Sequence, residues 1–331
     1  MLQPTLKRLF EYNTLSKAEA KEVLVNITRE NYSKSEVVAF LSVFMMRPVT
    51  VEELSGFRDG LLEQCKHVDL SDFQTIDMCG TGGDGKNTFN ISTLASLVVA
   101  GAGYKVAKHG NTGVSSACGS SNVMEYLGYK FTNDNELLKR QIDQSGICFL
   151  HAPLFHPAMK AVGPIRRELG IKTFFNMLGP MVNPAHPQFQ LVGVFSLELA
   201  RIYQYIYQQS TTKFSIVHSI DGYDEVSLTN AFKVISHKGE KLLKPEDINL
   251  PPNRPEDIFG GNTVEESASI FKKVLAGEGT PAQKNAVLAN AALAINTMDE
   301  QLTFEQCLQK ATDSLEGGKA AATFKKLLEI I

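Results

Sequence analysis

The sequence has no excess of basic residues, no closely spaced pair of cysteines and no long apolar run. With a formal net charge of −3 and a pI near 6.2, it offers no cationic surplus for a nucleic-acid backbone or an anionic membrane surface, so neither is an expected partner. Five scattered cysteines without a CxxC pair exclude a zinc ribbon or a redox dithiol and favour reduced thiols in the cytoplasm. The least polar segment, residues 91–103, is shorter than a bilayer span, and no signal peptide is visible.

What is present predicts a globular chain of two unequal parts. The 331 residues, 43% of them apolar, suffice for one large domain or two smaller ones. Residues 1–70 carry three capping boxes, each followed by apolar residues at helical spacing, which predicts a helical domain. The boxes pair Ser16 with Glu19, Ser33 with Glu36 and Thr50 with Glu53.

From residue 71 onward the pattern predicts an α/β domain that continues to residue 331. Short apolar runs alternate with helical segments, as expected of a mostly parallel central sheet flanked by helices. The runs are residues 75–78, 105–107, 148–150, 191–194 and 215–217. Residues 226–228 and 232–235 are expected to form a hairpin on that sheet, and the segment from 264 onward to form covering helices. Residues 157–187 are helical and proline-punctuated, and we expect them to join the N-terminal helical domain.

A glycine-rich loop, residues 79–90, follows the strand that ends near Asp77 and precedes a helix beginning at Ile91. Strand, glycine loop and helix form the order typical of phosphate binding, and Asn90 is positioned to cap the helix. The loop satisfies GxGxxG, but the acidic residue expected about twenty positions later is missing. It nearly satisfies the P-loop pattern, but Asn87 replaces the hydroxyl that would hold Mg²⁺. A plain connection is the third interpretation.

Two further segments favour a phosphate site. The next strand ends in Lys108-His109-Gly110-Asn111 and runs into residues 112–121, rich in glycine and hydroxyl groups. The carboxyl ends of parallel strands meet in one crevice, so both loops can grip one ligand. Another strand, residues 214–218, is followed by the segment 221–225, whose Asp224 and Glu225 form a solvated turn or, beside a pyrophosphate, hold Mg²⁺.

At these residues the chain resembles the anthranilate phosphoribosyltransferase family, from the N-terminal helices almost to the C-terminus. Five segments match that family's signatures in order, namely residues 80–84, 90–93, 108–111, 176–180 with 183–184, and 224–225. The family's architecture implies a helical domain hinged to an α/β domain, in a homodimer. Its activity implies transfer of a phosphoribosyl group to anthranilate, without a nucleophilic side chain, and with Lys108, Asp224 and Glu225 acting electrostatically.

The resemblance also implies a set of site residues. Phosphoribosyl pyrophosphate is expected at Gly80, Gly83, Asp84, Thr88, Asn90, Ile91, Ser92, Thr93, Lys108, His109, Gly110, Asn111, Ser115, Ser116 and Ser120. Mg²⁺, as two ions, is expected at Ser92, Asp224 and Glu225. Anthranilate is expected at Gly80, His109, Asn111, His156, Arg166 and Pro180.

The second loop departs from the commonest family pattern. Thr112, Ala117, Cys118 and Asn122 stand where many members have Arg, Lys, Ser and Asp, so two cations and a carboxylate are missing. Arg166 adjoins Arg167, and one of two neighbouring arginines on a helix is usually solvated; the family match favours Arg166 for the substrate.

Other functions are weighed on the same residues. A zinc site at His151 and His156 lacks the HExxH frame, so packing is favoured for both. A pyrimidine nucleoside phosphorylase would typically carry a further C-terminal domain. A non-catalytic nucleic-acid-binding relative should have a basic stripe and a degraded metal site, whereas this chain is mildly acidic and keeps Asp224 and Glu225.

Overall fold

The computed structural model describes residues 1–113 and 118–330, which divide into two compact units. The first unit comprises Met1–His67 and Ala152–Pro184, and the second comprises Val68–His151 and Ala185–Ile331. The chain thus leaves the first unit after His67, forms three strands of the second unit, returns to the first at Ala152 and leaves it again after Pro184. Within the described ranges, no helix is both long and apolar enough to cross a membrane.

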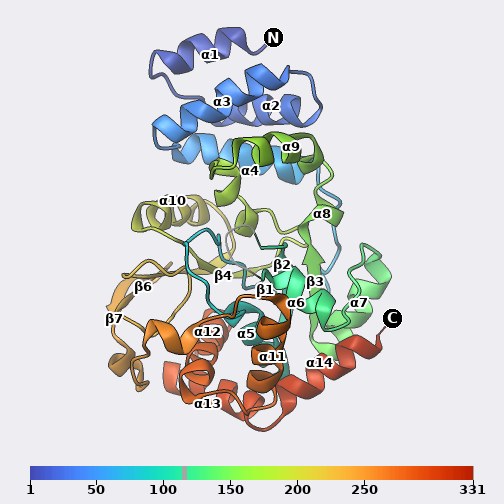
Figure 1. Ribbon diagram of the computed structural model, residues 1–331, viewed down its shortest axis with the longest axis vertical. Coiled ribbons are helices and arrows are strands. Elements are labelled where there is room, and N and C mark those ends of the chain that lie inside the picture. The colour runs from blue at the N-terminus through green and yellow to red at the C-terminus, as the bar shows by residue number, and fades with distance from the viewer. Residues whose placement is uncertain (114–117, 331) are drawn as a thin grey trace. The chain divides into compact units, whose positions relative to one another are not determined.

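The first unit is helical. Its helices are α1 (Gln3–Phe10), α2 (Lys17–Thr28), α3 (Lys34–Met46), α4 (Val51–Glu63), α8 (Ala152–Phe155) and α9 (Met159–Leu169), followed by the 3₁₀ turns η1 (Phe174–Met177) and η2 (Gly179–Met181) (Figure 1). All three predicted capping boxes form and start α2, α3 and α4. The rings of Phe57 and Phe174 stack with centroids 4.2 Å apart, beside Phe40 and Phe44, so residues distant in sequence share one core.

The second unit is built on a seven-stranded sheet in the order β3-β2-β1-β4-β5-β6-β7. The strands are β1 (Thr75–Asp77), β2 (Lys105–Gly110), β3 (Ile147–His151), β4 (Phe189–Gly193), β5 (Lys213–Ser219), β6 (Phe232–Ser236) and β7 (Gly239–Leu243). The first five in chain order are parallel and the last two antiparallel. The five predicted apolar runs all fall on the parallel strands. The expected α/β class with a smaller helical part is confirmed.

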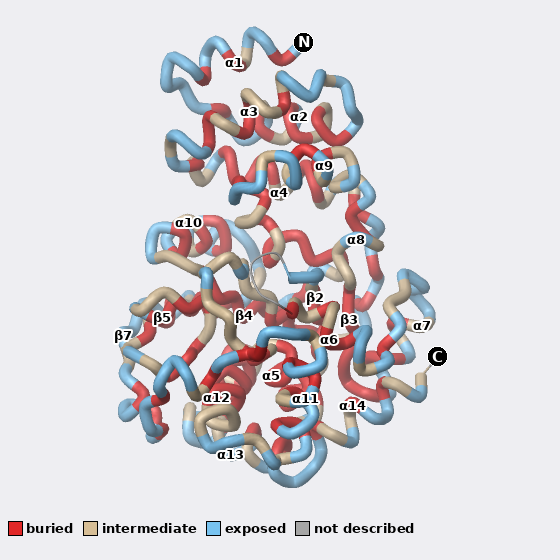
Figure 2. The backbone as a smooth tube through the Cα atoms, viewed as in Figure 1, coloured by how far each residue is buried: buried red, intermediate tan, exposed pale blue. Residues whose placement is uncertain are grey.

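Helices cover this sheet on both sides. They are α5 (Ile91–Gly101), α6 (Ser120–Tyr126), α7 (Asn135–Ser145), α10 (Leu197–Gln208), α11 (Val264–Leu275), α12 (Pro281–Met298), α13 (Phe304–Leu315) and α14 (Lys319–Glu329), with the 3₁₀ turns η3 (Pro245–Ile248) and η4 (Pro255–Ile258). Figure 1 shows α10 on one side of the sheet and α5, α11, α12, α13 and α14 on the other. Both α5 and α12 are buried along most of their length (Figure 2), so the core lies between them and the strands.

The predicted hairpin of residues 226–228 and 232–235 is wrong in its first strand. Residues 226–228 are buried but irregular, and Leu228 has a φ of 62°, in the left-handed region that breaks an extended strand. The hairpin instead joins β6 to β7 through a two-residue turn, with Ser236 paired to Gly239. The irregular segment carries Asp224 and Glu225 at its start, so its shape bears on the site.

Candidate active site

Four neighbouring strands, β2, β1, β4 and β5, deliver the candidate loops to one edge of the sheet. The glycine loop follows β1 and meets the loops after β4 and β5 directly. The Thr81 amide donates to the Gly193 carbonyl over 2.9 Å, and the Gly82 amide donates to Asp224 Oδ2 over 2.7 Å. At Gly80 a Cβ atom would lie 2.6 Å from that carboxylate oxygen, so the close approach requires glycine.

Asp224 and Glu225 do not form a solvated turn. Asp224 is 9% exposed and Glu225 is half-buried. The Glu225 carboxylate accepts a hydrogen bond from the Ser92 amide at 2.9 Å through Oε1 and one from Thr88 Oγ1 at 3.4 Å through Oε2. Both acidic residues therefore contact segments predicted to bind the sugar pyrophosphate.

The predicted capping of α5 by Asn90 is wrong. The Asn90 side chain makes no cap bond and instead donates from Nδ2 to the Cys118 carbonyl at 3.1 Å, joining the first loop to the second. Glu225 takes the capping role, since its carboxylate accepts the amide of the second helical residue, Ser92. Its oxygen satisfies one of the backbone amides that the start of a helix leaves without an intrahelical partner.

The carboxyl groups of Asp84, Asp224 and Glu225 form a mutually repelling cluster. Burial, followed by repulsion from Asp84, raises the pKa of Asp224 to about 7. Burial, followed by repulsion from Asp224 and Asp84, raises the pKa of Glu225 to about 8, and burial also raises the pKa of Asp84. Burial and mutual repulsion make it costly to ionise these three carboxyl groups together. Carboxylate oxygens gathered in this way suit a hard divalent cation such as Mg²⁺. Sequence reasoning assigned Asp84 to the substrate and missed its place beside the acidic pair.

Lys108 lies beside this cluster as a buried cation, 2% exposed. Its ammonium group donates to the Met78 carbonyl at 2.7 Å and lies 3.5 Å from Ser92 Oγ. The neighbouring backbone is fixed by Asp77, whose Oδ1 accepts the His109 amide at 3.0 Å.

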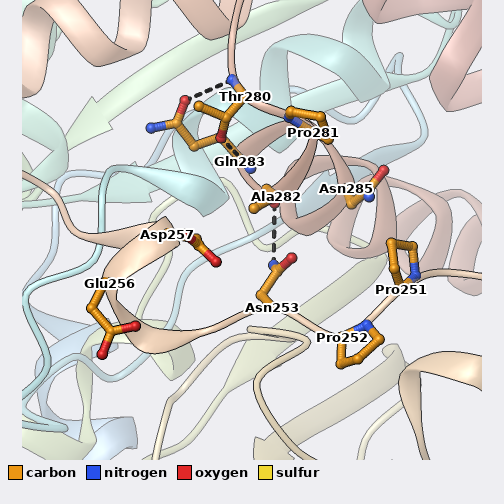
Figure 3. Close-up of a pocket in the computed structure, with 10 residues that line it drawn as sticks. All are labelled: Pro251, Pro252, Asn253, Glu256, Asp257, Thr280, Pro281, Ala282, Gln283 and Asn285. Carbon is orange, nitrogen blue, oxygen red and sulfur yellow. Dashed lines mark hydrogen bonds between the residues drawn. The ribbon is translucent and has the colours of Figure 1, made fainter.

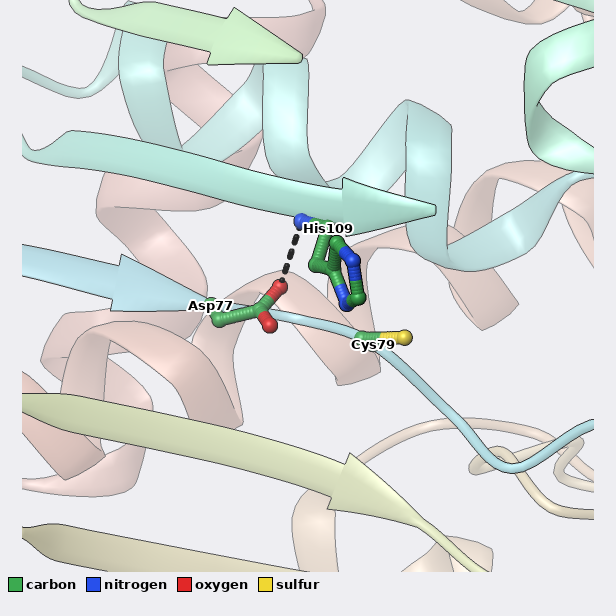
Figure 4. Close-up of side chains that lie close together, drawn as sticks. All are labelled: Asp77, Cys79 and His109. Carbon is green, nitrogen blue, oxygen red and sulfur yellow. Dashed lines mark hydrogen bonds between the residues drawn. The ribbon is translucent and has the colours of Figure 1, made fainter. Parts of the chain in front are cut away.

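Figure 4 shows the side chains of Asp77, Cys79 and His109 converging at the ends of β1 and β2. One donor atom from each lies within 4.8 Å of the others. Burial raises the pKa of the Cys79 thiol, which is therefore protonated at neutral pH. The His109–Asp77 bond ties the end of β2 to the end of β1, next to Lys108.

Asn122 binds two described amides of the second loop. Its Oδ1 accepts hydrogen bonds from the Gly113 and Gly119 amides at 3.0 and 3.1 Å. Ser120 Oγ donates to the Asn111 carbonyl at 3.3 Å. The acceptor of both hydrogen bonds is therefore the neutral side-chain oxygen of Asn122. Ser115, Ser116 and Ala117 lie outside the described residues.

Four further residues are expected to bind phosphoribosyl pyrophosphate, and the structure shows their burial or backbone conformation. They are Gly83, Ile91, Thr93 and Gly110. Ile91 and Thr93 are buried, at 0% and 1% exposure, and the Ile91 amide donates to the Phe89 carbonyl at 2.6 Å. Gly83 has a φ of 73°, which glycine adopts readily. Gly110 ends β2, where a Cβ atom would lie 2.5 Å from Ser120 Oγ.

The predicted acceptor residues Arg166, His156 and Pro180 belong to the first unit. Half-buried Arg166 donates to Asn176 Oδ1 at 3.4 Å, and its guanidinium carbon lies 5.4 Å from the centroid of the Phe175 ring, whereas Arg167 is exposed. Burial lowers the pKa of Arg166 but leaves it charged at neutral pH.

His156 is packed in the interior of the first unit. Its Nε2 hydrogen-bonds the Val182 carbonyl at 2.8 Å, and burial lowers its pKa to about 4, so it is neutral near pH 7. His151 belongs to the second unit, where its Nδ1 lies 2.8 Å from Ser121 Oγ. Pro180 is buried in η2.

A separate hollow of about 530 Å³ lies at the start of α12, outside these loops (Figure 3). It is lined by Pro251, Pro252, Asn253, Glu256, Asp257, Thr280, Pro281, Ala282, Gln283 and Asn285. None of the described site residues expected from the sequence is among them. Asn253 closes its floor by donating to the Ala282 carbonyl at 3.2 Å.

Comparison with known proteins gives a consistent result along the whole chain. Residues 3–65 match the helical bundle domain, and residues 72–321 the α/β domain, of a glycosyl transferase family. The anthranilate phosphoribosyltransferase of Flavobacterium psychrophilum is 59% identical over 98% of both chains, and that of Flavobacterium johnsoniae is 57% identical over 99% of both.

Solved structures agree. The anthranilate phosphoribosyltransferase of Thermus thermophilus superposes with a TM-score of 0.92 at 31% identity, over 98% of both chains. The Saccharomyces cerevisiae enzyme, solved in complex with phosphoribosyl pyrophosphate and Mg, superposes with a TM-score of 0.91 at 27% identity, over 99% of this chain and 97% of that one. With such similarity over both units, the chain belongs to the anthranilate phosphoribosyltransferase family of glycosyl transferases.

Proposed function

We propose that the chain transfers the phosphoribosyl group of 5-phosphoribosyl 1-pyrophosphate to the amine of anthranilate. The products are N-(5-phosphoribosyl)anthranilate and pyrophosphate, in the second step of tryptophan biosynthesis from chorismate. The observation that carries the proposal is the cluster of Asp84, Asp224 and Glu225, bonded to the glycine loop and to the start of α5. A plain glycine connection would not need buried acids against it, and a nucleoside phosphorylase is not favoured by the whole-chain comparisons.

The sugar pyrophosphate is proposed to bind along the glycine loop, the start of α5 and the second loop. The residues of the glycine loop, most of them exposed or half-buried, and the positive end of the α5 dipole favour a bound phosphate. Asn90 joins the two loops through the Cys118 carbonyl, so both are held around one ligand. The proposed contacts are Gly80, Gly83, Asp84, Thr88, Asn90, Ile91, Ser92, Thr93, Lys108, His109, Gly110, Asn111, Ser115, Ser116 and Ser120.

Mg²⁺ is proposed to bind at Ser92, Asp224 and Glu225, as two ions, with Asp84 close to the pair. Carboxylate and hydroxyl oxygens are its preferred protein ligands, and a divalent cation would relieve the repulsion that, after burial, raises the pKa values of the two acids. When bound, the metal would neutralise charge on the pyrophosphate. The yeast relative solved with phosphoribosyl pyrophosphate and Mg supports magnesium as the metal.

Anthranilate is proposed to contact Gly80, His109, Asn111, His156, Arg166 and Pro180. A yeast relative solved with 4-fluoroanthranilate supports an acceptor of this shape. Arg166 suits the acceptor's carboxylate because a planar guanidinium donates two parallel hydrogen bonds to it. Its present partner, Asn176 Oδ1, lies at 3.4 Å, a weak bond that a carboxylate can replace.

The reaction needs positioning and charge stabilisation more than proton transfer. The amine nitrogen forms a bond to the anomeric carbon while the bond to the pyrophosphate oxygen breaks, and the amine then releases a proton to water. Lys108 and the loop amides stabilise charge that develops on the leaving group. An aromatic amine is largely unprotonated at neutral pH, so neither a strong general base nor a nucleophilic side chain is required.

A homodimer is proposed on the family resemblance. A cytoplasmic location is proposed because the five cysteines are all free thiols.

One assay tests the central proposal, the loss of anthranilate fluorescence on addition of phosphoribosyl pyrophosphate with and without Mg²⁺. Activity should vanish with EDTA and return with Mg²⁺ but not with monovalent salt. Phosphorolysis of thymidine in place of anthranilate consumption would refute it.

A further inference from the structure

Asp224 and Glu225 lie in an irregular connection, residues 220–231, between β5 and β6. Two acidic side chains must be held there beside Asp84 although their charges repel one another. Regular backbone pairing does not fix the dipeptide, because it lies in neither a helix nor a strand. Its position therefore depends on contacts from other parts of the second unit.

Contacts from β4, β5 and α12 hold the backbone around Asp224 and Glu225. The end of β4 packs tightly on it, since a Cβ atom at Gly193 would come within 1.4 Å of the Asp224 carbonyl oxygen. Ser219, the last residue of β5, donates from Oγ to the Glu225 carbonyl at 2.7 Å. The next residue, Val226, is bound by both of its backbone polar groups to a single side chain, that of Asn290.

Asn290 lies in the middle of α12 and is 4% exposed. Its Oδ1 accepts the Val226 amide at 3.1 Å, and its Nδ2 donates to the Val226 carbonyl at 2.9 Å. The same Nδ2 also donates to the Ala286 carbonyl at 2.8 Å, one turn earlier in the helix. A primary amide presents an acceptor and a donor side by side, so Asn290 pairs with Val226 as a neighbouring strand would.

We infer that Asn290 is a positioning residue for the magnesium-binding carboxylates. It ties the chain directly after Glu225 to α12, a helix packed against β4 and β5, and so fixes the two acids against the glycine loop. The inference rests on the proposed function, because it assigns Asn290 to the metal site of that reaction. Asn290 acts on the two acids through the backbone of Val226, the residue that follows Glu225.

Replacing Asn290 by alanine would leave the Val226 amide and carbonyl buried without their partner. The backbone would shift, and with it the two carboxylates. Loss of a group that orients metal ligands typically weakens metal binding about 10- to 100-fold. Asn290→Ala should therefore weaken the binding of Mn²⁺ or Mg²⁺ by about that factor, while the KM for anthranilate, whose proposed carboxylate partner is Arg166, should change little.

Thr297→Ala provides a matched control in the same helix. Thr297 is 6% exposed and donates to Ser215 Oγ on β5 at 2.8 Å, so its loss also removes a buried bond between α12 and that strand, but away from the acids. Metal binding is measured by Mn²⁺ paramagnetic resonance titration in the presence of phosphoribosyl pyrophosphate without anthranilate. The Mg²⁺ concentration for half-maximal rate and the KM for anthranilate are measured in parallel, with thermal unfolding as the check on folding.

Selective weakening of Mn²⁺ binding in Asn290→Ala, with Thr297→Ala close to the unmodified chain, supports the inference. Equal affinity in Asn290→Ala and the unmodified chain, or equal weakening in both variants, overturns it. If Asn290→Ala does not fold, Ser219→Ala, which removes the other side-chain bond to the same segment, must show the selective defect or the inference fails. An unmodified chain that binds Mn²⁺ but consumes no anthranilate would instead refute the proposed function.

Discussion

Mg²⁺ should stabilise the protein more strongly as the pH rises from about 6 to about 8. In the metal-free state the pKa of Asp224 is raised to about 7 and that of Glu225 to about 8, by burial and by the neighbouring acids. An unfolded chain loses these protons near pH 4. Between about pH 4 and these raised pKa values, the folded state holds protons that the unfolded state has released.

The sign of the effect follows from this difference. Because the folded state binds more protons over that window, the free energy of unfolding falls as the pH rises, by about 1.4 kcal/mol per pH unit for each proton retained. The loss continues through the pKa of Glu225, about 8, and ends about one pH unit above it. Mg²⁺ expels the protons, so it competes poorly at pH 6 and well at pH 8.

Thermal unfolding at several pH values, with EDTA or with Mg²⁺, measures the effect. The double variant Asp224→Asn with Glu225→Gln serves as the reference, because its amides are neutral at every pH and other titrating groups are unchanged. It should lose most turnover, keep its fold and show a flat Mg²⁺ response. A Mg²⁺ shift in the unmodified chain that is independent of pH, or one that rises equally in the double variant, would refute the electrostatic account of the site.

Three further changes test other parts of the structure. Arg166→Ala should raise the KM for anthranilate about 10- to 100-fold, the value of a charged hydrogen bond of roughly 1.5–3 kcal/mol, and leave that for phosphoribosyl pyrophosphate unchanged. Arg167→Ala is the control, and a selective defect there instead would move the contact by one residue. Gly193→Ala should lower kcat about 100-fold, because the new Cβ would displace the Asp224 carbonyl. A normal rate in steady-state kinetics would contradict the close packing of Gly193 on Asp224. Glu53→Ala should lower the stability of the first unit by about 3–5 kcal/mol in chemical denaturation, because fully buried Glu53 accepts bonds from an arginine and two amides; a cost below about 1 kcal/mol would show that the pair contributes little.

Local patterns predicted much of this fold. Ser16, Ser33 and Thr50 start their helices because a capping box is complete within four residues. The apolar runs fall on parallel strands because a strand buried on both faces must be apolar. In each case the signal and the structure involve the same short stretch of chain.

The wrong and missing predictions concern contacts between segments that are distant in sequence. Asn90 has the right composition and place for a cap, but the Glu225 carboxylate, brought by another strand, occupies that end of α5. The place of Asp84 beside Asp224 and the pairing of Asn290 with Val226 likewise depend on how distant segments pack. A single sequence carries no local signal for such pairs, so the motif order supplied by the family resemblance was needed to group the site residues.

The bonds that assemble the acidic cluster join parts of the chain that are made far apart in time. The Gly82–Asp224 bond spans 142 residues and the Ser92–Glu225 bond 133, and Asn290 follows Val226 by a further 64. During synthesis the glycine loop and α5 emerge long before the acids they bind, and α12 emerges later still. Contacts of such long range form late because closing large loops costs chain entropy. A growing or truncated chain that ends before α12 therefore possesses both loops and both acids but lacks the helix that fixes them. The acidic cluster can take its final shape only when the second unit is nearly complete.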